Sequence, residues 1–392
     1  MRSIKDFDYF GKRVFLRLDL NVPVSNGVIL DKTRITKVIP TIKYLIERKA
    51  KIIIASHFGR PKVAYESKYS LEFLVEALEK ELNQKILFCS NYLNNQAKDM
   101  SNSLMEGQIL LLDNLRFHSG ETKNDIEFAK NLANLADFYI NDAFSCSHRA
   151  HASIEAIARL LPSAAGLLLF QEIEGLNKYL SDPKSPIMAI IGGSKISTKL
   201  DLLKQLINKV DYLAIGGAMA NTFLKSMSYE IGNSFYEEDL VETAKEILNN
   251  SGKCKIILPK DVVVAKKISS YVKGKIINID NIEKDEMILD LGPESISNII
   301  YILGGCKTVV LNGPVGMFEY ESFSKGTYSL ALAVANLTLD NKIISVAGGG
   351  DMVAALAGAK LFDPISYVST AGGAFLEWLE GKKLPGLKVL EN

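Results

Sequence analysis

The chain has 392 residues, which is too long for a single hydrophobic core, so we expect two domains. Hydrophobic residues make up 47% and charged residues 23%, the composition of an ordinary globular protein. The formal net charge of +1 argues against a protein that coats nucleic acid or binds membranes through a polybasic surface. Any anion site must therefore come from local clustering of charge.

The N-terminus and the cysteines favour a cytoplasmic location. The first ten residues, MRSIKDFDYF, carry charge throughout and lack the apolar segment of a secretory signal. No apolar run approaches the roughly 18 to 20 residues that span a bilayer. The four cysteines form no CxxC pair, so we expect free, buried thiols at Cys89, Cys146, Cys254 and Cys306. We expect neither a membrane nor a nucleic acid as partner.

Four apolar segments in the first half of the chain are predicted strands, and each ends in polar or charged residues. The segments are RVFLRLDLN (13–21), KIIIASHFGR (51–60), QILLLDNLRF (108–117) and DFYINDAF (137–144). The polar residues at or near their ends are Asp19, Asn21, Arg34, His57, Arg60, Arg116, His118, His148 and Arg149. In the first segment, a period of two puts Arg17, Asp19 and Asn21 on one face. An edge strand with one solvated face would show the same pattern.

The segment ARLLPSAAGLLLFQEIEGLNKYLSDPKSP (158–186) separates the two halves of the chain. Its pattern predicts a long amphipathic helix that ends near Pro183 and Pro186, and no strand. We therefore expect a first domain over 1–165, a connecting helix over 166–184 and a second domain over 185–373.

In the second half, the predicted strands end in glycines. They are SPIMAIIGG (185–193), VDYLAIGG (210–217), KIILPKDVVVA (255–265), KTVVLNGPVG (307–316), KIISVAGGGD (342–351) and ISYVSTAGG (365–373). Helical patterns such as STKLDLLKQLINKV (197–210) alternate with them. This alternation predicts an α/β protein whose two parallel sheets carry helices on both faces.

Ligands bind at the carboxyl ends of strands in such sheets, so the residues found there indicate the chemistry of each half. Arginine suits planar capture of phosphate or carboxylate, and the first half therefore indicates a small substrate with several negative charges. A scattered, solvated surface is the alternative. His148 and His151, together with Cys146, could ligate a metal, but no carboxylate completes the set, so we favour a structural or anion-binding role.

The glycine-rich loops of the second half indicate a phosphate site. Lys195 and Lys199 lie four residues apart on a predicted opening helix, where both could point at a phosphate or simply face solvent. In NGPVGMFE (312–319) a rigid turn precedes Glu319 and could hold a base or a ribose. The run GGGDM (348–352) predicts a helix N-terminus that cradles phosphate, with Asp351 placed to hold Mg²⁺. No loop matches GxxxxGK[ST] or GxGxxG.

Ten motifs, taken together, resemble the phosphoglycerate kinase family. They are RLDLNVP, TRI, SHFGRP, NLRFHSGE, NDAFSCSHRAHAS, GGSKISTKLDLL, GGAMANTF, NGPVGMFE, GGGDM and STAGGAFLEWLEG, in the order of that family, from about Arg13 to Gly386. The resemblance implies two Rossmann-like domains joined by a helix, with residues 374–392 returning to the first domain. It implies a monomer that reversibly transfers a phosphoryl group from 1,3-bisphosphoglycerate to ADP in glycolysis, with Mg²⁺ carried on the nucleotide.

The resemblance also implies three sets of site residues. The glycerate is expected on Asp19, Asn21, Arg34, His57, Arg60, Arg116 and Arg149. The nucleotide is expected on Gly192, Gly193, Lys199, Gly217, Asn312, Glu319, Gly349, Gly350, Asp351 and Met352, with Asp351 holding Mg²⁺. The catalytic groups are expected to be Arg34, Lys195, Lys199, Gly350 and Gly373, the two glycines acting through helix N-terminal N–H groups.

Two positions depart from the family pattern. Ala371 replaces a glycine but keeps its backbone N–H. Met352 stands where the family usually has Thr or Ser, which puts one hydroxyl contact to phosphate in doubt. We expect Met352→Thr to tighten nucleotide binding or raise kcat modestly, unless the Met352 side chain packs against its neighbours.

In the ATP-consuming direction the nucleophile is a carboxylate, which is already ionised at pH 7, so no general base is needed. Catalysis is then expected to rest on positioning and charge stabilisation after the two domains close. A nicotinamide-dependent oxidoreductase is one alternative, but the GxGxxG fingerprint is missing. A binding protein that closes on a small anion is another, opposed by the two chemically different halves.

Overall fold

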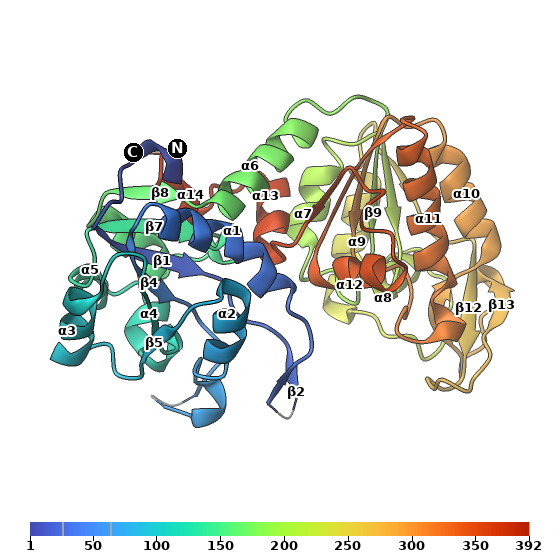
Figure 1. Cartoon of the computed structure of the whole chain (residues 1–392). Helices are drawn as coiled ribbons and strands as arrows, with labels where there is room; N and C mark the ends of the chain where they lie inside the picture. The colour runs from blue at the N-terminus through green and yellow to red at the C-terminus, as the bar shows by residue number, and fades with distance from the viewer. Residues whose placement is uncertain (26, 63–64, 392) are drawn as a thin grey trace. The chain divides into compact units, whose positions relative to one another are not determined.

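The computed structural model describes residues 1–25, 27–62 and 65–391. The chain forms two compact units, of which unit 1 comprises Met1–Glu174 and Lys383–Asn392 and unit 2 comprises Gly175–Lys382. The expected division had placed residues from 374 onward with the first domain, whereas the structure groups α13 (Gly373–Leu379) with unit 2. The boundary between the units falls inside α6 (Leu167–Leu180), in the segment expected to be a connecting helix (Figure 1).

Unit 1 is built on a six-stranded parallel sheet. Its strands, in spatial order, are β5 (Ile86–Cys89), β6 (Ile109–Leu112), β4 (Lys51–Ala55), β1 (Arg13–Leu18), β7 (Phe138–Asp142) and β8 (Ser163–Ala165). Its helices are α1 (Thr33–Glu47), α2 (Leu74–Leu82), α3 (Asn95–Ser103), α4 (Ser119–Thr122), α5 (Ile126–Ala133) and α14 (Pro385–Lys388). A small hairpin, β2 (Val24–Ser25) and β3 (Val28–Ile29), precedes α1.

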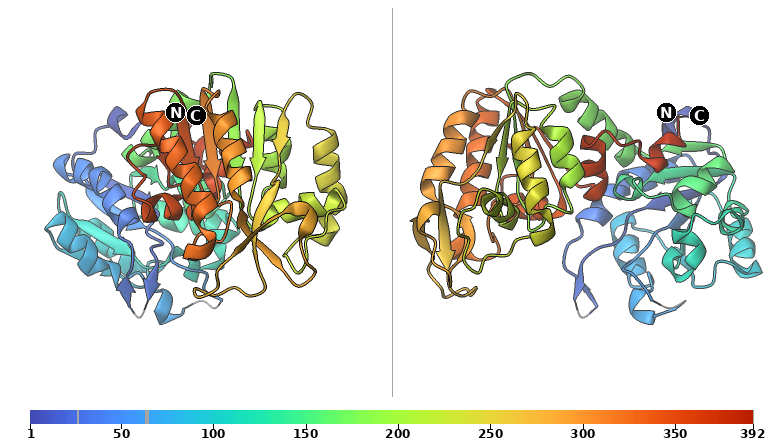
Figure 2. Two further views of the ribbon diagram at one scale, coloured as in Figure 1. Left: turned by 90° about the vertical axis from the view of Figure 1, so that its right-hand side faces the viewer. Right: turned by 180° about the vertical axis from the view of Figure 1, so that it is seen from behind.

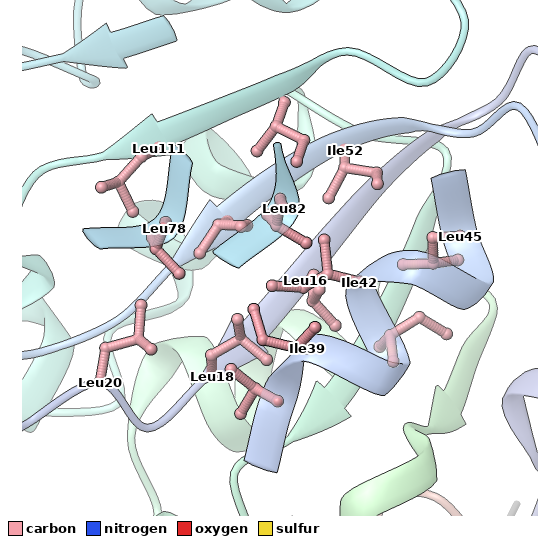
Figure 3. Close-up of a cluster of buried hydrophobic side chains, with 14 of the residues drawn as sticks. Leu16, Leu18, Leu20, Ile39, Ile42, Leu45, Ile52, Leu78, Leu82 and Leu111 are labelled. Atoms are coloured by element: carbon pink, nitrogen blue, oxygen red, sulfur yellow. The ribbon is translucent and has the colours of Figure 1, made fainter. Parts of the chain in front are cut away.

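Alternating residues of the central strand β1 form the core of unit 1. Leu16 and Leu18 are buried against α1 and α2, which cover one face of the sheet (Figure 3). Arg17 points to the other face and is also fully buried, and β1 lies between β4 and β7 rather than at an edge of the sheet. The edge-strand interpretation of this segment is therefore wrong, and the polar residues at its end belong to the interior.

Unit 2 contains a second six-stranded parallel sheet and a smaller antiparallel one. The larger sheet has the order β11 (Lys255–Ile257), β10 (Tyr212–Ile215), β9 (Ile187–Ile191), β15 (Thr308–Asn312), β16 (Ile344–Gly348) and β17 (Tyr367–Ser369). The smaller sheet has the order β13 (Lys275–Asn278), β12 (Asp261–Ala265) and β14 (Met287–Leu291). Helices flank both parallel sheets of the chain, which confirms the α/β class predicted from the sequence.

The helices of unit 2 cover both faces of its larger sheet. They are α7 (Leu200–Leu206), α8 (Ala218–Ser226), α9 (Val241–Asn249), α10 (Pro293–Leu303), α11 (Lys325–Leu339), α12 (Gly350–Gly358) and α13. Helices α10 and α11 lie on one face and α7 and α9 on the other (Figures 1 and 2). The strands of the sheet are thus buried on both sides, as their apolar sequences require.

Two predicted elements differ from the structure. The segment expected to lack strands contains β8, a three-residue edge strand that pairs with β7 and is too short to show a period. The segment 255–265 was expected to be one strand but forms two, in different sheets. Pro259 lies between them and cannot donate to a sheet ladder, so the strand is interrupted there.

One buried carboxylate joins β7 to the start of α6. Asp142 ends β7, and its Oδ1 accepts the Leu169 N–H at 2.9 Å in the first turn of α6. Gly166 passes so close that a Cβ there would lie 2.3 Å from Oδ1. Burial raises the pKa of Asp142 to about 6 from an ordinary 3.8. The folded protein therefore binds this proton more tightly than the unfolded chain does.

The raised pKa of Asp142 gives a signed prediction for stability. The contribution of the protonated form is present at low pH and is lost as the pH rises toward 6, a change of about 2 kcal/mol between pH 4.5 and 7.5. The Tm of Asp142→Asn relative to wild type should therefore rise by roughly 4–8 °C across this range. Scanning calorimetry at the two pH values measures the change.

Asp137→Asn is the matched control, because the pKa of Asp137 is shifted in the opposite direction to that of Asp142. Although burial acts in the other direction, hydrogen bonds from Arg13 lower the pKa of Asp137. Its stabilising contribution is fully present above the ordinary pKa of 3.8 and is lost only as the pH falls through the lowered pKa, so Asp137→Asn should carry nearly the same penalty at pH 4.5 and at pH 7.5. A Tm profile of Asp142→Asn that runs parallel to those of wild type and Asp137→Asn would contradict the assignment.

Candidate functional site

Unit 1 carries a polar cavity of about 730 Å³, which we call the cationic site. Three arginines predicted from separate strand ends, Arg60, Arg116 and Arg149, line it together. The other lining residues are Pro61, Lys62, Phe117, His118, Ser119, Thr122 and His151. Lys62 was not among the expected site residues because it lies in the loop after Arg60, beyond any strand-end signal.

Asp19 organises the side of unit 1 that contains Arg34. It is buried, and it accepts hydrogen bonds from Arg34 Nη1 at 2.5 Å, from the Ser145 hydroxyl and from the Asn21 N–H. Although burial alone would raise the pKa of Asp19, the charge of Arg34 and the other donors lower it. An ionised Asp19 is thus fully engaged with donors of the protein and orients Arg34.

Arg17 is a site feature that the sequence showed but did not assign. Its Nε donates to Ser153 Oγ at 2.8 Å, Nη1 donates to the Leu18 carbonyl, and Nη2 lies 3.3 Å from His57 Nδ1. A guanidinium can only donate, so His57 Nδ1 must accept and its proton is on Nε2. Burial, then the charge of Arg17, lowers the pKa of His57 well below its usual value. His57 is therefore a neutral donor at pH 7, whereas the sequence grouped it with the cations.

Asn21 fixes the loop that carries Arg60. Asn21 Oδ1 accepts the Gly59 N–H at 2.9 Å, and the Gly59 carbonyl accepts from Arg116 Nη1 at 2.5 Å. Gly59 has a φ of +59°, and a Cβ there would meet the Tyr69 ring at 2.4 Å. This network joins loops after three strands and holds their donors at one edge of the sheet.

The metal-ligand alternative does not gain support from the geometry. Among the described residues, the side chains of ligand type that gather within 4.8 Å are Asp19, His57 and Cys146, rather than the expected His148 and His151 with Cys146. Arg17 and Arg34 contact two members of that group. Guanidinium groups so close oppose a cation, and the site favours an anion.

In unit 2 the loops after three adjacent strands meet and form what we call the glycine-rich site. Asn312 ends β15, and in the sheet its register partners are Ile191 of β9 and Gly348 of β16. Its Nδ2 donates to the Gly348 carbonyl at 2.8 Å, and its carbonyl accepts the Gly192 N–H at 2.9 Å. Asn312 is buried and joins all three loops.

Each of the three consecutive glycines, Gly348 to Gly350, is a glycine for a different physical reason. A Cβ at Gly348 would lie 2.3 Å from the Phe375 ring, and Gly349 has a φ of +93°. Gly350 begins α12 and has no atom within 4 Å of the position of a Cβ. Close approach of a ligand is therefore possible at Gly350, while the two preceding glycines serve the packing and turning of the protein itself.

Lys195 and Lys199 do not share a helix, because α7 begins only at Leu200. The Lys199 Nζ donates to the Gly192 carbonyl and, at 3.0 Å, to the Asn312 carbonyl. Burial lowers the pKa of Lys199 to about 8, although the charge of Asp351 acts in the opposite direction. Lys195 is exposed, and its Nζ lies 5.9 Å from the centroid of the Phe235 ring. The expectation of two lysines on one helical face is wrong.

A cavity of about 550 Å³ opens beside these loops. Gly193, Gly217, Glu319 and Asp351, all expected from the sequence, line it. Its apolar walls come from Val315 and Met317 of the predicted NGPVGMFE segment and from residues that the sequence did not indicate, namely Phe235, Ile268, Met287, Ile288, Leu289 and Leu291. Several belong to β14, a strand that was not predicted. An apolar slot with charged groups at its edges suits a planar base that carries phosphates.

The Met352 side chain is only 3% exposed and packs in the main apolar cluster of unit 2. It is packed among apolar side chains and is not one of the residues that line the cavity, which supports the packing alternative. The backbone N–H of Met352 lies in the first turn of α12, where such groups have no partner within the helix.

An arginine-rich site for a small anion in one α/β unit and a site suited to a nucleotide in the other define a phosphotransferase. A model of the family "Phosphoglycerate kinase" matches residues 4–382. The chain is 50% identical over 387 residues to the phosphoglycerate kinase of Chelativorans sp., covering 98% of this chain and 97% of that one. It is 48% identical over 391 residues to that of Rhodospirillum centenum, covering 99% of each.

Solved structures agree with these relatives. Phosphoglycerate kinase from Coxiella burnetii superposes with a TM-score of 0.88 at 42% identity, over 99% of this chain and 98% of that one. The enzyme from Pyrococcus horikoshii gives 0.86 at 31% identity, over 100% and 98%. The chain belongs to the phosphoglycerate kinase family. Its activity is the reversible transfer of a phosphoryl group between 1,3-bisphosphoglycerate and ADP in glycolysis, which excludes the oxidoreductase and the binding protein.

The burial of Met352 reverses the expected result of its substitution. Met352→Thr should now lower stability by about 1–3 kcal/mol, because it removes apolar contacts and buries a hydroxyl, and it should not tighten nucleotide binding. Met352→Leu, which keeps the volume, is the control and should unfold close to wild type. Unfolding in urea together with the KM for ATP tests both statements, and a lower KM in Met352→Thr would contradict them.

The lowered pKa of Lys199 predicts proton uptake when MgADP binds. Near pH 8 about half of the Lys199 amines are neutral, and a phosphate bound beside them would raise their pKa, so up to about half a proton would be taken up per nucleotide. Uptake should disappear near pH 6.5, where Lys199 is already charged. Titration calorimetry in two buffers of different ionisation enthalpy measures it.

Lys199→Arg should abolish this uptake because arginine stays protonated, whereas Lys195→Arg should leave it unchanged. Equal uptake by both variants at pH 8 would assign the proton to another group.

Proposed function

We propose that the two substrates of the reaction bind in different units. 3-Phosphoglycerate would bind in the cationic site, with its phosphate on Arg60, Arg116 and Arg149. Its carboxylate end would face Asn21, Arg34 and the Nε2–H of His57. This assignment is supported by the three arginines that line one cavity and by the donor set around Asp19.

The nucleotide would bind in the glycine-rich site. Its base would occupy the apolar cavity, with Glu319 near the ribose. Its phosphates would lie along Lys199 and the first turn of α12, where the N–H groups of Gly350, Asp351 and Met352 have no partner within the helix. Gly192, Gly193, Gly217, Asn312 and Gly349 would shape the loops beneath. The open space above Gly350 supports this placement.

The observation that carries the mechanism is the absence of a free base around Arg34 among the described residues. Asp19 is saturated by donors, and His57 Nδ1 faces Arg17. A carboxylate nucleophile needs no base. Its oxygen can attack the γ-phosphorus directly while the bond to the ADP oxygen breaks, so catalysis rests on alignment and charge.

We propose that Arg34 and Lys195 stabilise the transferring phosphoryl group together with Lys199. The N–H groups at Gly350 and Gly373 begin α12 and α13 and would add donors to the same group. Since acid and nucleotide are held by different units, transfer requires a hinge motion that aligns them and excludes water from the acyl phosphate.

Mg²⁺ would arrive with the nucleotide and would be held by Asp351. This residue fits the role because its carboxylate offers hard oxygen ligands, lines the cavity and belongs to the first turn of α12. When bound, the ion neutralises charge on the phosphates.

We propose that the enzyme acts as a monomer in the cytoplasm. Both sites are built from residues of one chain, and all four cysteines are free and buried, which is typical of a reducing compartment. None of the helices in the described residues is long and apolar enough to cross a bilayer.

A coupled assay with MgATP and 3-phosphoglycerate tests the function as a whole, with turnover dependent on both substrates as the expected result. Arg34→Ala tests the assigned chemistry. It should lower kcat by roughly 10²-fold or more, the usual effect of losing one transition-state donor. Arg34→Lys should not restore full activity, because lysine lacks the planar fork that Asp19 orients.

Arg48→Ala is the control. It also removes one positive charge, but from the opposite end of α1, where Arg48 stacks on Tyr44, and it should leave kcat unchanged. An Arg34→Ala enzyme with the kcat of wild type and only a raised KM would show that Arg34 contributes to binding alone.

A further inference from the structure

A buried carboxylate lies in the wall of the nucleotide cavity and has no role in the mechanism above. Asp290 is on β14, is 2% exposed and lines the cavity of the glycine-rich site. Its Oδ2 accepts the Gly326 N–H at 2.7 Å in the first turn of α11. Its Oδ1 has no hydrogen-bond partner among the described residues.

The carboxylate lies between α11 and the loop of residues 313–319. We call this loop the shelf. A Cβ at Gly316 of the shelf would lie 2.1 Å from Asp290 Oδ1, and a Cβ at Gly326 would lie 2.3 Å from it. Neither glycine has a positive φ, and at both positions Asp290 is the nearest obstacle to a Cβ, ahead of the Phe323 carbonyl at 2.8 Å from the Gly316 position and Val315 Cγ2 at 3.2 Å from the Gly326 position.

The backbone of the shelf is hydrogen-bonded to α11 and to β14, the strand that carries Asp290. The Val315 N–H donates to Thr327 Oγ1 on α11 at 3.1 Å, and the Met317 N–H donates to the Leu289 carbonyl on β14 at 2.9 Å. Asp290 lies between these two attachments. Val315, Met317 and Glu319 of the shelf line the cavity, so the placement of the shelf sets the shape of the cavity.

A second buried aspartate in the same small sheet shows what a purely structural role looks like. Asp261 on β12 uses both oxygens, because Oδ2 accepts the Glu294 N–H at 3.0 Å and Oδ1 accepts the Ser295 N–H at 2.7 Å. These bonds cap α10, and Asp261 does not line the cavity. Asp290 by contrast makes one such bond and directs its other oxygen against the shelf.

Burial raises the pKa of Asp290 to about 7, so the fold maintains an ionisable group where its charge is disfavoured. The amino end of α11 offsets part of this cost. An apolar residue of similar size would avoid the cost but could not accept the Gly326 N–H.

We propose that Asp290 is a positioning residue for the nucleotide: by joining the first turn of α11 to the shelf, it holds Val315, Met317 and Glu319 in the arrangement that receives the base and ribose. The proposal rests on the nucleotide site proposed above.

The test compares Asp290→Ala, Asp290→Asn and Asp261→Ala in the full-length enzyme. Asp290→Ala should raise the KM for MgATP about 10-fold, with the KM for 3-phosphoglycerate unchanged and kcat within about 3-fold of wild type. Asp290→Asn should restore most of the loss, because its amide oxygen can still accept the Gly326 N–H. Asp261→Ala should lower the Tm but leave the KM for MgATP as in wild type.

A Tm loss for Asp290→Ala with no selective change in the KM for MgATP would overturn the proposal, as would an equal rise in that KM for Asp261→Ala. If Asp290→Ala does not fold, Gly326→Ala replaces it. Its Cβ displaces the carboxylate while Asp290 is retained, and it should raise the same KM.

Ala218→Phe separates this proposal from the nucleotide site on which it rests. Ala218 lines the cavity, and the larger ring would fill it. Loss of MgADP binding by calorimetry places the nucleotide there. Unchanged MgADP binding by Ala218→Phe would refute that site and with it the proposed role of Asp290. If Ala218→Phe loses MgADP binding but Asp290→Ala has the same KM for MgATP as wild type, only the role of Asp290 is refuted.

Discussion

A parallel strand that is buried on both faces can present reactive groups only near its ends, and in open α/β sheets ligands bind at the carboxyl ends. This constraint determines the organisation of the enzyme. Each unit has a six-stranded sheet of this kind, so its chemistry lies in loops that neighbouring strands bring together. In unit 1 these loops carry long charged side chains. In unit 2 they expose backbone, because Asn312 holds the loops after three adjacent strands in contact through its side chain and its carbonyl.

Because both faces of each sheet are covered, some charged side chains near the strand ends are buried. The two units differ in the hydrogen-bond partners that they give to these side chains. In unit 1, Arg17 and Asp19 are each surrounded by hydrogen-bond partners, and they orient His57 and Arg34. In unit 2, Lys199 is held by two backbone carbonyls that provide hydrogen bonds without a formal negative charge. Because it is buried, the pKa of this amine is lowered to about 8, close to neutral pH.

The fold class and most site positions could be predicted because strands such as β1, β9 and β15 have long apolar sequences that end in polar residues or glycines. The strand β8 could not, since three small residues show no period, and β14 was missed because its sequence MILDL resembles a helical stretch as much as a strand. Because β14 was not predicted, the apolar wall of the cavity in the glycine-rich site and the position of Asp290 in it were not predicted either. The burial of Met352 depends on what packs around the first turn of α12, and local sequence does not encode that. The roles assigned to individual site residues remain predictions.

Unit 1 is discontinuous in the chain, and this affects its biosynthesis. The Gly386 N–H donates to the Ser147 carbonyl at 2.9 Å, next to the segment that carries His148 and Arg149, and a Cβ at Gly386 would collide with Ile154. Near the N-terminus, the Arg2 N–H donates to the Leu390 carbonyl (Figure 1). A ribosome makes all of unit 2 before it reaches these residues. The packing next to Arg149 is therefore completed only after unit 2 has been synthesised, so a prematurely released chain lacks a finished cationic site.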